Sequence, residues 1–188
     1  MTLTTILLAG GRSRRMGRDK ATMIVYGEPL WQRQLRVLRG LPPSSLWVSA
    51  RVRLPWCPPE IEVLLDQPPS RGPLSGVAAG LCRLQTSHLL VLAIDLPRVS
   101  TDHLRKLWSL ARPGSGVIPQ NDGYFEPLCA VYPAEAAGLA QEAITSVNAS
   151  LQPFARTLLS RSWAQAYALT PQERSLYLNL NAPSDLPP

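Results

Sequence analysis

Strand-like apolar runs alternate with segments of helical spacing along the first half of the chain. Four of these runs are expected to form strands, at residues 4–9, 46–49, 61–65 and 88–94. The last run is apolar almost throughout, which is typical of a central strand buried on both faces of a parallel sheet. Apolar residues at helical spacing predict one helix around Leu30 to Leu38 and another that starts near Pro73. This alternation predicts an α/β fold with three layers and a doubly wound, mostly parallel sheet.

The second half of the chain is less regular. Residues 116–120 and 126–132 flank an Asn-Asp-Gly turn signal, so we expect an antiparallel strand pair there. Ser100 is expected to cap a helix that runs through Trp108. Later elements are expected at residues 134–145 (helix), 151–161 (helix) and 164–169 (strand). His88 is expected to pack at a strand start, whereas His103 is expected to face solvent.

Length and composition favour one domain over residues 1–188. The sequence lacks both a run of the ~20 apolar residues that a membrane span needs and the pattern of a signal peptide. Its three cysteines are widely spaced and lie near neither histidine, which disfavours zinc sites and disulfide frameworks. We therefore expect a cytoplasmic protein with reduced thiols and no membrane partner.

The formal net charge of +6 has two interpretations. A basic chain can bind nucleic acid. However, the cations outside residues 12–20 are scattered, and no basic stripe interleaved with aromatic residues is present. We therefore favour a scattered arginine surface with one anion site, which makes nucleic acid an unlikely partner.

A glycine-rich, cationic segment directly follows the first apolar run. Residues 7–21 read LLAGGRSRRMGRDKA. Glycines allow backbone N–H groups to approach a ligand closely, and the following cations supply donors for phosphate oxygens. The segment is neither a Walker A loop nor a GxGxxG fingerprint. It predicts a phosphate-binding loop, and a glycine turn followed by solvated arginines is the less favoured alternative. In such a loop Lys20 would suit the α-phosphate or the leaving pyrophosphate, Arg15 could clamp the β and γ oxygens, and Asp19 could orient Lys20.

Two aspartates follow expected strands. Asp95 ends the most apolar run, and open α/β sheets bind ligands beyond the carboxyl ends of their strands. A carboxylate there can hold Mg²⁺ together with phosphate oxygens, although an aspartate before Pro97 can also cap a turn. Asp66 can accept hydrogen bonds from a base or ribose, or serve only as a loop residue in a proline turn. The Gly-Pro-Leu-Ser-Gly segment at 72–76 opens a helix whose amides can face an anion.

The segment LAGGRSRRMGRDK resembles the signature LAGG-x-S-x-RMG-x-DK of the molybdenum cofactor guanylyltransferase (MobA-like) family. Four later segments resemble the family's motifs in the same order. They are GEPL at 27–30, Asp66 with GPLSG at 72–76, IDLP at 94–97 and NLNAP at 179–183. Three places depart from the family pattern. Ser49 stands where an asparagine is usual, Ala93-Ile94 replaces the more usual cysteine before the aspartate of IDLP, and Glu126 precedes Pro127 where some members have His-Pro.

The resemblance implies an Mg²⁺-dependent nucleotidyltransferase that transfers GMP from GTP to the phosphate of molybdopterin and releases pyrophosphate. Residues 1–100 would form the nucleotide-binding half and residues 101–188 the acceptor-binding half. Further implied partners are molybdenum-cofactor assembly and acceptor proteins. The implied catalytic residues are Lys20, Arg15 and Asp95, with Asp95 as the metal ligand. The implied nucleotide contacts are Leu8, Ala9, Gly10, Gly11, Ser13, Lys20, Asp66, Gly76 and Asp95. Asn179 and Asn181 are implied acceptor contacts, and an Asx turn before Pro183 is the alternative.

Two other functions stay open on the sequence. One is a cytidylyl or other nucleotidyltransferase that acts on a different phosphate, because no residue in the sequence shows which nucleotide base is bound. The other is a nucleotide-binding accessory protein without catalysis. The residues establish neither the acceptor, nor the oligomeric state, nor the number of nucleotides attached per metal centre.

Overall fold

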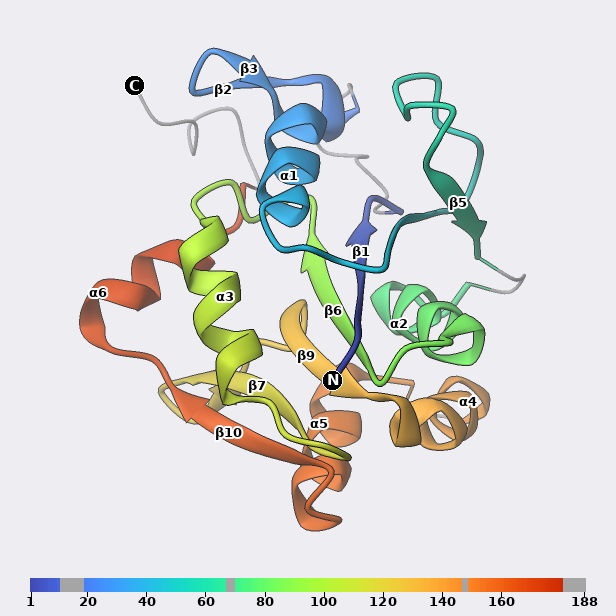
Figure 1. The fold of residues 1–188 in the computed structure, drawn as a ribbon, viewed down its shortest axis with the longest axis vertical. Helices are drawn as coiled ribbons and strands as arrows, with labels where there is room; N and C mark the ends of the chain where they lie inside the picture. Colours follow the sequence, from blue (N-terminus) through green and yellow to red (C-terminus); the bar gives the residue numbers. More distant parts are fainter. Residues whose placement is uncertain (11–18, 67–69, 147–148, 181–188) are drawn as a thin grey trace.

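The computed structural model describes residues 1–10, 19–66, 70–146 and 149–180 (Figure 1). Its central sheet has eight strands in the order β10-β7-β9-β6-β1-β4-β5, with β8 paired to β7. The strands of this sheet are β1 (Leu3–Leu8), β4 (Ser45–Ala50), β5 (Glu62–Leu65), β6 (His88–Ala93), β7 (Gly116–Asn121), β8 (Tyr124–Phe125), β9 (Cys129–Pro133) and β10 (Ala164–Ala168). A separate hairpin pairs β2 (Ile24–Val25) with β3 (Glu28–Pro29).

Helices connect and cover these strands. The α-helices are α1 (Leu30–Arg39), α2 (Pro73–Arg83), α3 (Thr101–Leu110), α4 (Ala137–Thr145), α5 (Leu151–Ser160) and α6 (Pro171–Arg174). Short 3-10 helices lie at Lys20–Thr22, Ala134–Ala136 and Ser175–Tyr177. In the described part of the chain, no helix is both long and apolar enough to span a lipid bilayer.

The sheet is mostly parallel, as predicted. Strand β1 pairs in parallel with β4 and β6, and further parallel pairs join β4 to β5 and β10 to β7. Strand β9 runs antiparallel to both β6 and β7. The second strand of the expected pair, at residues 126–132, forms only from Cys129 as β9, and the short β8 precedes it at Tyr124–Phe125. Pro127 lies between the two strands and has no N–H to donate to a ladder.

The apolar core forms one layer on each face of the sheet. One cluster packs α1 and α3 on the sheet through Leu35, Leu38 and Leu104. The other packs α2, α4 and α5 through Val77, Ala140, Phe154 and neighbouring apolar residues. Figure 1 shows the sheet between these two groups of helices. The prediction of a three-layer, doubly wound fold is therefore confirmed.

Both histidines are buried, although only His88 was expected to be. His88 is fully buried at the start of β6, as predicted. Ser100 caps α3, and its Oγ accepts the His103 N–H at 3.2 Å. The prediction that His103 faces solvent is wrong, because its side chain is buried and its Nε2 lies 2.7 Å from the Tyr177 hydroxyl. The C-terminal segment covers this face of α3, which the local spacing around His103 cannot reveal.

Candidate functional site

The candidate site lies where the sheet order reverses. The chain leaves β1 toward β4 on one side, whereas β6 flanks β1 on the other side. Open α/β sheets bind ligands at such a switch point, outside the carboxyl ends of the strands. Gly10 follows β1 and Asp95 follows β6. The two strand ends are joined by a hydrogen bond of 3.0 Å from the Ile94 N–H to the Leu8 carbonyl.

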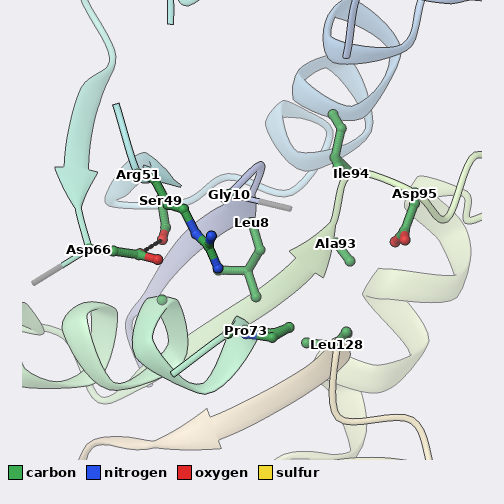
Figure 2. A pocket seen from close by; sticks show the side chains of 12 residues that line it. Leu8, Gly10, Ser49, Arg51, Asp66, Pro73, Ala93, Ile94, Asp95 and Leu128 are labelled. Atoms are coloured by element: carbon green, nitrogen blue, oxygen red, sulfur yellow. Dashed lines mark hydrogen bonds between the residues drawn. The ribbon is translucent and has the colours of Figure 1, made fainter. Parts of the chain in front are cut away.

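A cavity of about 180 Å³ opens at this point (Figure 2). Five residues that the sequence singles out line it: Leu8, Gly10, Asp66, Gly76 and Asp95. The other lining residues are Ser49, Arg51, Gly72, Pro73, Ala93, Ile94 and Leu128. Figure 2 shows Asp66 and Arg51 at one end of the cavity and Asp95 at the other. One cavity therefore holds the acceptor Asp66 and the donor Arg51 at one end and a second carboxylate, Asp95, at the other.

Hydrogen bonds fix Asp66 at the end of β5. Its backbone N–H donates to the Ala50 carbonyl at 2.9 Å. One carboxylate oxygen accepts the Ser49 hydroxyl at 3.2 Å, and the other accepts the Ser70 hydroxyl at 2.9 Å. A carboxylate oxygen has more than one acceptor site, so Asp66 can still accept a hydrogen bond from a ligand. Ser49 therefore orients the Asp66 carboxylate through this hydrogen bond.

Arg51 supplies an unused donor at the same end. It follows β4, and Figure 2 shows its guanidinium pointing into the cavity. Its Nε is buried and has no hydrogen-bond partner within the described residues. Leaving a buried donor unsatisfied costs about 1–3 kcal/mol, so a ligand that presents an acceptor here would recover that energy.

Helix α2 begins at the cavity wall. Gly72 precedes the helix with a φ of +70°, a conformation that side-chain-bearing residues rarely adopt. Pro73 occupies the first turn, where its missing N–H is not needed. Gly76 allows close packing, because a Cβ there would lie 2.5 Å from Ser49 Oγ and 2.9 Å from Leu8 Cδ2. The helix N-terminus can therefore face the cavity at short range.

Asp95 and Lys20 lie together at the opposite end. Lys20 Nζ is 3.9 Å from Asp95 Oδ2 and donates to the Leu180 carbonyl at 2.7 Å. The Leu180 N–H in turn donates to the Asp95 carbonyl at 2.8 Å. Burial raises the pKa of the Asp95 carboxyl, and the Lys20 charge opposes that shift. Asp19 holds the short helix that carries Lys20, since its carboxylate accepts the Ala21 N–H at 3.0 Å.

The site offers a metal ion one partly exposed carboxylate, that of Asp95, rather than a full set of protein ligands. Within residues 1–10, 19–66, 70–146 and 149–180 there is no group of three His, Cys, Asp or Glu side chains that could hold a metal ion. Mg²⁺ is usually held by one or two carboxylates together with substrate phosphates and water. The Asp95 side chain keeps 28% of its surface exposed beside the cavity, so these residues fit an ion that arrives with a triphosphate.

Other candidate residues differ in how far they join the cavity. Ala9 lies beside it, and its N–H donates to the Ser49 carbonyl at 2.9 Å. Asn179 is exposed and is not among the lining residues. Gly11, Ser13, Arg15 and Asn181 lie outside the described residues.

Sequence reasoning missed Arg51 and Leu128. Arg51 directly follows a strand, as Asp95 does, so the strand-end rule that selected Asp95 could have found it. Leu128 reaches the cavity only because β9 pairs with β6, and its carbonyl accepts the Ala93 N–H at 2.8 Å. No local signal marks that contact.

Comparisons with known proteins identify the family of the chain. Residues 5–169 match the family model described as the MobA-like NTP transferase domain. The chain is 34% identical to a protein of Opitutus terrae named probable molybdenum cofactor guanylyltransferase, over 97% of this chain and 92% of that protein. It is 32% identical to the molybdenum cofactor guanylyltransferase of Pseudomonas putida, over 96% and 94% of the two chains.

A solved structure has the same fold. Molybdopterin-guanine dinucleotide biosynthesis protein A from Archaeoglobus fulgidus superposes with a TM-score of 0.69 at 25% identity, and the match covers 97% of this chain and 94% of that one. The family match spans most of the chain and includes every residue that lines the cavity. The chain therefore belongs to the MobA-like nucleotidyltransferases.

Proposed function

We propose that this chain transfers GMP from GTP to the phosphate of molybdopterin, in its molybdenum-loaded form, and releases pyrophosphate. One observation carries the proposal: a single cavity at the switch point has Arg51 and Asp66 at one end and Asp95, beside Lys20, at the other. A nucleotide fits this arrangement with its base at the first end and its phosphates at the second. The names of the relatives support the same reaction.

The first end is complementary to guanine. Guanine presents O6 and N7 as acceptors on one edge, and arginine is the side chain that most often binds them. The same base carries N–H donors on its neighbouring edge, which a carboxylate can accept. Arg51 has the unsatisfied buried Nε, and Asp66 has acceptor capacity left after its bonds to two serine hydroxyls.

The second end suits the chemistry of phosphoryl transfer. An oxygen of the acceptor phosphate forms a bond to the α-phosphorus of GTP, the bond to the bridging oxygen breaks, and pyrophosphate leaves. The attacking oxygen is already anionic, so no general base is required, and charge repulsion is the main barrier. Lys20 would offset charge at the phosphates, and Arg15 is proposed to hold the β and γ oxygens. Asp95 would hold Mg²⁺, which supplies further charge neutralisation when bound.

The acceptor is proposed to lie near Asn179 and Asn181. The residue between them, Leu180, is hydrogen-bonded through its backbone to both Lys20 and Asp95. These two hydrogen bonds hold Leu180 beside Lys20 and Asp95, which supports the proposal of an acceptor site near this segment.

A nucleotide panel tests the proposal. Purified protein is incubated with molybdopterin, Mg²⁺ and one of GTP, CTP, ATP or UTP, and pyrophosphate release is measured. GTP alone should support release. Release with CTP would identify a cytidylyltransferase, and binding of a nucleotide without release would identify an accessory protein.

Two arginine substitutions test whether Arg51 recognises the base. Arg51→Met should lower kcat/KM for GTP by about tenfold, since one good arginine–guanine pair contributes about 1–3 kcal/mol. Arg53→Met is the matched control, because Arg53 lies two residues further along and lines a different pocket. Equal effects of the two substitutions would contradict the assignment of Arg51.

A further inference from the structure

A buried glutamine faces the loop that carries Asp95. Gln34 lies on α1 with no exposed surface. Its Nε2 donates to the Leu96 carbonyl at 2.9 Å and lies 3.4 Å from the carbonyls of Ala93 and Ile94. A buried amide is costly unless it is hydrogen-bonded. The Ala93 carbonyl is at the end of β6, and the Ile94 and Leu96 carbonyls lie in the short connection between β6 and α3.

Two further bonds complete the restraint of this loop. Arg33, next to Gln34 on α1, donates from Nε to the Pro97 carbonyl at 2.7 Å. The Leu180 N–H donates to the Asp95 carbonyl at 2.8 Å. Every carbonyl oxygen from residue 93 to residue 97 therefore accepts a hydrogen bond from α1 or from the C-terminal segment.

Core stability alone does not explain Gln34. Its neighbours on the buried face of α1 are apolar, as Leu35, Val37 and Leu38 show. Its own Oε1 is buried without a hydrogen-bond partner in the described part of the chain, which is a cost that an apolar side chain would avoid. The amide points Nε2 toward the loop, because this nitrogen carries both N–H donors of the side chain and the loop presents carbonyl oxygens.

We propose that Gln34, assisted by Arg33, is a positioning residue that holds the Asp95 carboxylate toward the cavity and Lys20. Part of this inference rests on the proposed function, in which Asp95 holds the divalent cation. Side chains that orient metal ligands commonly affect metal affinity or activity about 10–100-fold when they are replaced.

Amide hydrogen exchange of the metal-free and nucleotide-free protein is the first test. Gln34→Met keeps the approximate shape and removes the donor. Exchange at the Ile94 and Leu180 amides should become about tenfold faster, beyond any change in global stability. Val37→Ala is the matched control, because it removes buried surface from the same helix but keeps the hydrogen bonds that Gln34 and Arg33 donate to the loop, and it should change these amides only as much as global stability changes. Equal exchange in the two variants would overturn the inference.

The requirement for the metal is the second test. Gln34→Met should raise the Mg²⁺ concentration for half-maximal activity about tenfold, with little change in KM for GTP. Val37→Ala should change neither. If Gln34→Met does not fold, Arg33→Met removes the bond to Pro97 at a partly exposed site and is compared with the same control, with the Leu96 amide added to the exchange measurement.

The two proposals fail in different ways. If the wild-type protein releases no pyrophosphate from any nucleotide, the proposed function fails, and hydrogen exchange still decides whether Gln34 positions the loop. If the wild type turns over normally but Gln34→Met leaves both exchange and the Mg²⁺ requirement unchanged, only the positioning role fails.

Discussion

At the scale of single residues, the site depends on two opposite charges held close together at the end of β6. Asp95 and Lys20 are 3.9 Å apart, and each is also tied to the backbone of Leu180. Burial raises the pKa of Asp95, so folding disfavours its ionised form. A group that is costly to bury and yet placed at a cavity is a candidate for function rather than for stability.

The substitution Asp95→Asn distinguishes a role of Asp95 in catalysis from a role in stability. A raised pKa means that the folded state binds the proton more tightly than the unfolded state, so ionisation of Asp95 near pH 7 reduces stability. The neutral variant should keep or slightly raise the thermal unfolding temperature, while turnover falls about 100-fold or more. Asp102→Asn, at an exposed carboxylate that pairs with Arg105, should leave turnover unchanged. A clear loss of thermal stability with normal turnover would show that Asp95 is structural.

Lys20→Met tests whether the ammonium meets charge that develops during the reaction. Turnover should fall by more than about tenfold, which corresponds to about 1.4 kcal/mol of barrier. KM for GTP should change less than kcat, because an interaction made mainly in the transition state affects turnover. Lys106→Met removes the chain's other lysine, which pairs with Glu173, and serves as the control. A raised KM with unchanged kcat would mean that Lys20 only binds substrate.

At the scale of elements, the position of α2 against the strand ends shapes the cavity. Residues 72–76 were expected to open a helix, and α2 starts at Pro73. The sequence did not indicate how closely the helix approaches Ser49 and Leu8. Gly76 sets that distance, because the space beside it is already filled by side chains from β1 and β4.

Gly76→Ala should therefore destabilise the protein. The added Cβ would meet Ser49 Oγ at 2.5 Å, and such overpacking costs about 1–3 kcal/mol. Gly138→Ala, in α4, is the control: a Cβ there meets nothing within 4 Å and should add about 0.5–1 kcal/mol of stability. Urea unfolding of both variants measures the difference. A neutral Gly76→Ala would show that α2 moves away from the sheet at little cost.

At the scale of the whole molecule, contacts between distant segments make stability depend on pH. His88 Nε2 lies 3.0 Å from the Arg112 carbonyl, and His103 bonds to Tyr177 in the C-terminal segment. Burial lowers the pKa of both side chains below the ordinary value. The unfolded chain therefore binds protons more readily than the folded one as the pH falls below the ordinary histidine pKa of about 6.5.

The free energy of unfolding should accordingly decrease as the pH is lowered from about 7 to about 5, by at most about 1.4 kcal/mol per pH unit for each histidine. His103→Gln removes one of the two titrating groups, so its stability should fall less steeply over the same range. Urea titrations at several pH values give both slopes. Identical slopes for the wild type and the variant would contradict the lowered pKa of His103.

The sequence by itself determined the alternation of strands and helices, the three-layer fold class and the residues that end its strands. Those features are local: hydrophobic period, capping residues and glycines at turns act within a few residues of chain. On that basis Asp66 and Asp95 could be selected as residues that follow strands, whereas Leu8, Gly10 and Gly76 were implied by the family resemblance; all five line one cavity.

Only the tertiary structure decided which side chains meet across the sheet. Arg51 lines the same cavity as Asp66 and Gly76 because the ends of β4, β5 and α2 lie together, and Gln34 reaches the Asp95 loop from 59 or more residues away in sequence. His103 is buried by Tyr177 for the same reason. Each of these contacts is made where one element packs on another. Packing brings together residues that are far apart in the sequence, and the local periodicity of the sequence does not show which of them will meet.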